Sequence, residues 1–368
     1  MRLKFFMVAL LMILVPHALY AGGPFFIDDV NLTGVAKQWP NNTVEWYIDD
    51  GRLSNTISNA DAKKIVQDLL NEWSAVTIDN AGNQAVSTTV VKNVFKGSVG
   101  EDINFANHAK YVNEDPRTII ILDETGEITD KLIGEGNKEF IPGFTSVNFL
   151  GSAGASMNKG IMVLNGYVLT QKKLSQDADV ALNFFKAVAL HELGHLLNFD
   201  HIQSNYDIAR ACTRNGRCDD ANYIPTMYPQ LLTTLQNILD RDDKISTSWI
   251  YPSDAFKKDF CTITGEIFDA KGNPLSGVNV LAIRAGEGDV VAKVDVRSFV
   301  SGAMQPACKG NDSHYYLQGI TPGRTYQVVY EPLGEGLRGV SGFNPLPGGD
   351  MSVPPPQEFS KGEIKSAS

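Results

Sequence analysis

The sequence has no excess of basic residues and few of the residue types that bind transition metals. It has 32 lysines and arginines against 42 aspartates and glutamates, which gives a formal net charge of -10. This composition offers no positive field to attract phosphate backbones, so nucleic acid is not an expected partner. Histidine and cysteine number only 6 and 4 among 368 residues. Any clustering of either residue type is therefore informative.

Long hydrophobic runs are also scarce, and the clearest example lies at the start of the chain. Residues 5–15 are apolar, Arg2 and Lys4 precede them, and Ala18 and Ala21 follow them. This is the pattern of a secretory signal peptide, which we assign to residues 1–21. The apolar run is too short to span a bilayer comfortably. We therefore expect no membrane span and a secreted protein, either extracellular or periplasmic.

Export makes the four cysteines candidates for disulfide bonds. Four cysteines allow three pairings, and proximity in the sequence favours Cys212 with Cys218 and Cys261 with Cys308. Zinc binding by these thiols is the alternative, but their spacing matches no common cysteine zinc knuckle. The sequence therefore predicts two short-range disulfides.

The length of the chain favours two folded units, because single cores rarely grow this large. In the first unit, apolar periodicity predicts strands at residues 44–48, 118–122 and 161–164, a helix that begins at Ser58 or Asn59, and a long helix at residues 179–197. The Gly-rich residues 134–160 predict only loop with short irregular strands.

The composition changes after residue 252, where short alternating runs separated by turns begin. This spacing predicts an all-β sandwich unit. We therefore assign residues 22–256 to the first unit, residues 257–346 to a β-sandwich accessory domain, and the Pro-rich residues 347–368 to a flexible tail.

The segment HELGHLLNFDH has the spacing of a metal site. His191 and His195 lie four residues apart, so a helix places both imidazoles on one face, about 6 Å apart along its axis. The helix must then end for a third ligand to return, and Asn198 tolerates the left-handed conformation that such an ending needs. His201 follows and completes three nitrogen ligands. A fourth position left for water is typical of catalytic zinc.

Glu192 lies beside these ligands and predicts hydrolytic chemistry. Zinc held by three neutral imidazoles lowers the pKa of a bound water to roughly 7. Glu192 could take that proton as general base and deliver it to a leaving amine, while the metal stabilises the oxyanion. A chance HExxH on an amphipathic helix is the alternative. Three of the five histidines outside the signal peptide lie within eleven residues, which favours the metal site.

This segment resembles the HExxHxxGxxH signature of metzincin metalloproteases, with Asn198 in the place of the usual glycine. The sequence IPTMYP at residues 224–229 is similar to the Met-turn of matrixins, and the resemblance implies that Met227 forms a hydrophobic floor below the ligands. Pro229 occupies the place of the tyrosine ligand of astacins, so no such ligand is expected. The resemblance covers roughly residues 38–252 and implies an α+β fold, with a twisted mixed sheet and a long active-site helix.

The second unit resembles the transthyretin-like, carboxypeptidase-regulatory-like sandwich modules of secreted hydrolases, on the pattern of residues 265–278. The sequence as a whole thus predicts a secreted zinc-dependent endopeptidase with a protein or peptide substrate. A secreted binding or adhesion protein with a structural zinc site is the alternative, although it has no use for Glu192. Many matrixins are silenced by a prodomain cysteine, but every cysteine here follows Tyr206. A separate protein inhibitor is therefore a candidate partner.

Residues 123–130, with the sequence DETGEITD, are a candidate for a second metal site. Its carboxylates could bind Ca²⁺, but they lack the ligand order of an EF-hand. A solvated turn is the alternative.

Overall fold

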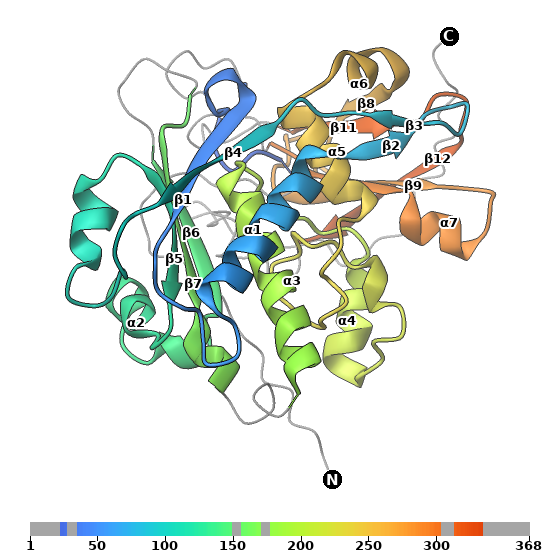
Figure 1. Cartoon of the computed structure of the whole chain (residues 1–368). Helices are drawn as coiled ribbons and strands as arrows, with labels where there is room; N and C mark the ends of the chain where they lie inside the picture. Colours follow the sequence, from blue (N-terminus) through green and yellow to red (C-terminus); the bar gives the residue numbers. More distant parts are fainter. Residues whose placement is uncertain (1–22, 28–34, 149–155, 171–176, 303–312, 334–368) are drawn as a thin grey trace.

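The computed structural model describes residues 23–27, 35–148, 156–170, 177–302 and 313–333 (Figure 1). Within these residues the fold is mixed α+β, with one five-stranded mixed sheet and three small antiparallel sheets. The large sheet has the order β4-β1-β5-β7-β6, formed by β4 (Lys92–Ser98), β1 (Thr43–Ile48), β5 (Thr118–Asp123), β7 (Lys159–Asn165) and β6 (Gly143–Asn148). Neighbouring strands are parallel except β6, which runs antiparallel to β7 at the edge.

Three strands of this sheet confirm predicted ones. β5 and β7 are buried along their whole length. Continuous burial is expected of parallel strands that are covered on both faces, which explains their uninterrupted apolar sequences. β1 confirms the strand expected at residues 44–48, with one additional residue at its start.

The structure corrects the prediction for residues 134–160, because they include the regular strand β6. Its inward positions are held by Gly143, Thr145 and Val147, so the strand lacks the apolar alternation by which strands are recognised. A β-carbon on Gly143 would lie 3.0 Å from Val188 Cγ1 and 3.2 Å from Glu192 Cγ. A larger residue at this position would therefore crowd the helix that carries the metal motif.

Two helices cover the large sheet, α1 (Asn59–Ser74) and α3 (Ala178–Leu196), and they lie side by side in Figure 1. The Ser58 hydroxyl accepts a hydrogen bond from Asp61 N, which confirms the predicted start of α1. Trp73, fully buried on α1, donates from its indole nitrogen to the Leu190 carbonyl at 3.1 Å. α1 therefore supports α3 one residue before the first candidate ligand.

The C-terminal unit contains two antiparallel sheets that share one core (Figure 1). The first has the order β10-β9-β12 and the second β11-β8, formed by β8 (Cys261–Glu266), β9 (Val278–Arg284), β10 (Val296–Val300), β11 (His314–Ile320) and β12 (Tyr326–Pro332). A short helix, α7 (Asp289–Val294), lies between β9 and β10. The prediction of a purely β unit is therefore wrong in this detail. The other strands and α-helices of the described residues are β2 (Thr77–Asp79), β3 (Ala85–Ser87), α2 (Glu127–Ile133), α4 (Tyr206–Asn215), α5 (Arg241–Ile250) and α6 (Asp254–Asp259).

The two units are joined by a buried polar contact. The predicted boundary between residues 256 and 257 falls inside α6, and α5 packs against β10 and β11. Asp242 on α5 pairs with Arg297 on β10, and neither side chain is more than 1% exposed. Ser298 also donates to Asp242 Oδ2, from its backbone nitrogen at 3.0 Å and its hydroxyl at 2.7 Å. The C-terminal unit is therefore packed as part of one structure with the first.

One predicted disulfide is confirmed, between Cys212 and Cys218. Cys261 is exposed, but Cys308 lies outside the described residues, so their pairing stays a prediction. The expected signal peptide at residues 1–21 and tail at residues 347–368 also lie outside them. None of the described helices is long and apolar enough to cross a membrane.

Arg297→Met should show how strongly the two units depend on each other. The variant leaves the Asp242 carboxylate buried without its guanidinium partner, so we expect the free energy of unfolding to fall by about 3–5 kcal/mol. The double variant Asp242→Asn, Arg297→Met should recover part of that loss, because no buried charge remains. Chemical denaturation of the full chain measures both. An Arg297→Met protein as stable as the wild type would contradict the coupling.

Candidate metal centre

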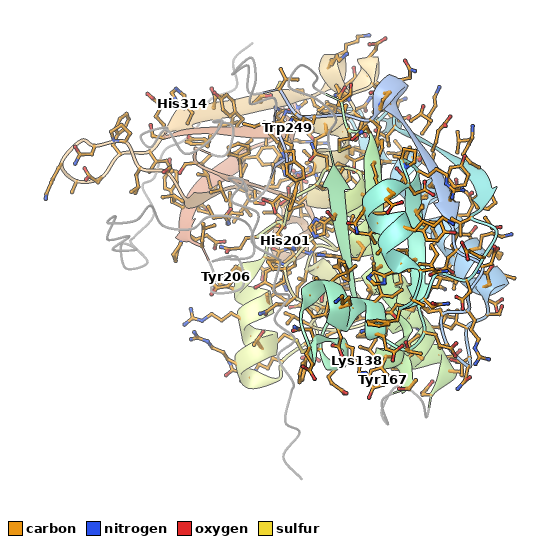
Figure 2. The ribbon with its side chains drawn as sticks, turned by 90° about the vertical axis from the view of Figure 1, so that its left-hand side faces the viewer. Lys138, Tyr167, His201, Tyr206, Trp249 and His314 are labelled. Carbon is orange, nitrogen blue, oxygen red and sulfur yellow. A yellow bond between two sulfur atoms is a disulfide. The ribbon has the colours of Figure 1, made fainter. Side chains whose placement is uncertain are left out.

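The three predicted ligands come together. His191 and His195 project from α3, and His201 follows it on the next loop; one ring atom from each lies within 4.8 Å of the other two. His195 and His201 are 2% and 0% exposed, while His191 is partly open. Figure 2 shows His201 in the interior, between the large sheet and the C-terminal strands.

Backbone carbonyls orient two of the imidazoles. His191 Nδ1 donates to the Thr226 carbonyl at 2.7 Å, and His195 Nδ1 donates to the Phe199 carbonyl at 2.8 Å. With the proton held on Nδ1, each ring directs the lone pair of its Nε2 toward the other, and these two nitrogens lie 3.1 Å apart. Two lone pairs facing each other repel unless a cation lies between them. Tetrahedral zinc with Zn–N distances of about 2.0–2.1 Å separates its nitrogen ligands by about 3.3 Å, so the spacing fits such an ion.

Burial keeps the three rings neutral. It lowers the pKa of His191 to about 4 and that of His195 to about 3, with the neighbouring His191 as a second cause for His195. The pKa of His201 is also lowered, first by burial and then by the other two rings. Neutral imidazole is the form that binds metal, so all three are ready to do so at neutral pH.

A turn at the end of α3 brings the third ligand back. Asn198 has a φ of 76°, as predicted for the residue at which the helix ends. The last carbonyls of α3 do not remain unsatisfied: Trp39 Nε1 donates to Leu196 O at 2.8 Å, and the Tyr251 hydroxyl donates to Leu197 O at 3.1 Å. The helix end is therefore held from two sides.

The side chain of Glu192 is 3% exposed, and it lines the same pocket as His191. Burial raises the pKa of its carboxyl group to about 8. Its Oε2 atom makes no hydrogen bond within the described part of the chain. A buried carboxylate oxygen without a partner is costly, and such groups occur where a ligand or catalytic role requires them.

Met227 is fully buried against the underside of α3. A β-carbon on Gly194 would overlap Met227 Sδ, so a larger residue there would displace the methionine. Asp243 accepts hydrogen bonds from the backbone nitrogens of Thr226, at 2.8 Å, and Met227, at 3.1 Å. This carboxylate thereby holds the carbonyl of Thr226 in place for His191.

A pocket opens beside Glu192 and His191, and most of the surface that lines it is apolar. Its lining residues are Pro142, Phe184, Ala187, Val188, His191, Glu192, Thr226, Tyr228, Pro229, Leu231 and Gln236. Sequence patterns identified His191 and Glu192 but not the pocket, because its lining joins α3 to Pro142 and to residues 226–236, which lie far apart in the sequence.

The proposed calcium segment does not gather its carboxylates. Asp123 accepts from Thr129 N and Oγ1, both at 2.8 Å, and Asp130 Oδ1 accepts from Lys138 N at 2.8 Å. The second half of the segment begins α2, so it is not simply a turn. Among the residues that the structure describes, only the three histidines bring three ligand atoms together. The calcium prediction therefore receives no support.

Comparisons with known proteins do not assign a family to this chain. No protein-family model matches the chain, and no curated protein matches it at a significant level.

His201→Ala should weaken metal binding, because it removes the ligand that closes the site. We expect about one zinc per chain in the wild type and clearly less in the variant after dialysis against a weak chelator. Mass spectrometry of the metal content measures this. His314→Ala is the control, since His314 lies on β11, well away from His201 (Figure 2). Equal zinc content in the wild type and His201→Ala would show that the third ligand is misassigned.

Proposed function

We propose that this protein is a secreted zinc-dependent endopeptidase with a metzincin-like, matrixin-type catalytic unit. The observation that carries the proposal is the buried Glu192 carboxylate, whose Oε2 lacks a partner within the described residues and which shares a pocket with His191. A base beside a three-histidine centre is what hydrolysis at a metal requires.

The donor set favours zinc. Neutral imidazoles suit Zn, Cu, Fe and Ni, and three protein ligands with an open position are typical of catalytic zinc. When bound, zinc would supply a positive charge that acidifies water and stabilises negative charge on the carbonyl oxygen. His191, His195 and His201 would hold it, since each ring is neutral and the first two direct Nε2 inward.

Glu192 carries the proton. Its burial makes the carboxylate a stronger base than one in water, because the charged form is poorly solvated. In the proposed reaction, it takes a proton from the attacking water as the new C–O bond forms. It then passes this proton to the amine nitrogen as the C–N bond breaks. The carboxylate is regenerated, so the cycle needs no other reactant.

The pocket suggests the substrate class. Phe184, Ala187, Val188 and Leu231 line it next to Glu192. An apolar lining of this kind favours peptides with an apolar side chain close to the scissile bond.

The alternative is a binding or adhesion protein with a structural zinc site. Structural zinc sites are usually closed by four protein ligands. Here three ligands gather within the described residues, and the residue beside them is a buried base. These features favour catalysis over a structural role.

Glu192→Gln should separate metal binding from chemistry. The amide keeps the shape of the side chain but cannot accept the proton, so we expect wild-type zinc content and a catalytic efficiency lowered by about 100-fold or more. Hydrolysis of an unfolded protein substrate measures this, with the chelator-treated wild type as the reference for full inactivity. Near-normal turnover by the variant would rule out Glu192 as the base.

Val188→Ala should change specificity. The variant enlarges the pocket, so it should favour substrates with larger apolar side chains. We expect the ratio of catalytic efficiencies for larger over smaller apolar side chains to rise by about tenfold. Cleavage profiles on a peptide library measure the ratio. Val180→Ala is a matched control, because Val180 lies on the same helix but is 41% exposed and outside the pocket. An unchanged profile for Val188→Ala would mean that this pocket does not bind the substrate side chain.

A further inference from the structure

The side chain of Asn198 does more than permit a turn. It is fully buried, and all three of its bonds reach backbone groups more than 160 positions away in the sequence. Oδ1 accepts from Phe26 N at 2.7 Å, and Nδ2 donates to Phe26 O at 2.8 Å and to Lys37 O at 2.7 Å. A buried amide is tolerated when its donors and acceptor are satisfied, and this one is.

These bonds hold residues 23–27 along the loop that connects two ligands. Phe25 N donates to the Asn198 carbonyl at 2.8 Å, and Asp200 N donates to the Gly23 carbonyl at 3.0 Å. Pro24 pairs with Phe199 in an isolated β-bridge. The N-terminal segment thus runs beside the chain from Asn198 to Asp200, immediately before His201.

The same segment also contacts a ligand. The Phe25 ring lies 5.7 Å from the ring of His195, measured between centroids. The acceptor for His195 Nδ1 is the carbonyl of Phe199, the residue that pairs with Pro24. A change in residues 23–27 would therefore alter both the orientation of the His195 ring and the path of the chain to His201.

The left-handed backbone does not by itself explain an asparagine here. Glycine adopts the same φ without strain, and it would remove the cost of burying an amide. What asparagine adds is the link between residues 26 and 37 and the ligand loop.

We propose that Asn198 is a positioning residue of the metal centre, and that through it residues 23–27 form a strap that holds the loop between His195 and His201. The inference rests on the proposed binding of a metal by the three histidines, but not on peptidase activity. Loss of a group that orients ligands commonly costs about 10- to 100-fold in metal affinity, which sets the expected size of the effect.

The test is Asn198→Gly in the full chain, which keeps the positive φ and removes the three side-chain bonds. We expect zinc affinity, from competition with a chromophoric chelator, to fall about 10- to 100-fold. The absorption spectrum of the Co²⁺-substituted protein should change, and the amides of Phe25 and Phe26 should exchange hydrogen faster. Asn198→Asp keeps the acceptor for Phe26 N and loses both donors. This second variant is used if Asn198→Gly fails to fold, and we expect it to change the zinc affinity, the Co²⁺ spectrum and the hydrogen exchange in the same directions.

Asn205→Gly is the matched control. Asn205 also has a positive φ, 56°, but its Nδ2 donates to the carbonyls of Tyr223 and Lys293, which lie outside the strap. It should leave zinc affinity and the Co²⁺ spectrum unchanged. Wild-type zinc affinity and Co²⁺ spectrum in a folded Asn198 variant, or equal losses in Asn205→Gly, would overturn the inference. A wild type that binds no zinc would instead refute the metal centre, and one that binds zinc without hydrolysing peptides would refute only the peptidase proposal.

Discussion

The candidate site depends on one reversal of the chain. α3 delivers two imidazoles on one face, and the left-handed residue Asn198 ends the helix so that His201 returns to them within a few residues. Because this reversal is buried, its polar groups must find partners, and these come from Trp39, Tyr251 and the strap at residues 23–27. The ligand geometry is therefore a property of the surrounding chain as much as of the motif.

Two adjacent carboxylates extend this dependence to the C-terminal unit. Asp243 holds the backbone of Thr226 and Met227, and the Thr226 carbonyl orients His191. Asp242 binds Arg297 and Ser298 of β10. Since the two carboxylates are consecutive on α5, the first turn of one helix connects the candidate site to the C-terminal sheets. The C-terminal sheets therefore pack against the helix that supports Thr226.

Burial has opposite effects on the two kinds of group at the centre. It lowers the pKa of each histidine, so the imidazoles are neutral, and it raises the pKa of Glu192, so its carboxylate holds a proton more strongly. Both effects follow from the cost of placing charge away from water. One dry environment thus has both of the effects that the proposed function requires of these side chains.

Features that depend on local spacing could be predicted from the amino-acid sequence. These include the pairing of His191 with His195, the turn at Asn198, the buried strands β5 and β7, and the disulfide between Cys212 and Cys218. Each follows from helical periodicity, apolar runs or proximity along the chain.

Contacts that join distant segments arise only in the folded chain. The Thr226 carbonyl that accepts from His191, the partners of Asn198 at residues 26 and 37, and the pair Asp242–Arg297 have no sequence signature. Every residue carries a backbone carbonyl, so the sequence cannot mark which one will face a ligand. Strand β6 is more regular than the loop with short irregular strands that the sequence predicts. Its inward Gly143 and Thr145 break the apolar alternation, and they meet α3 only in the folded chain.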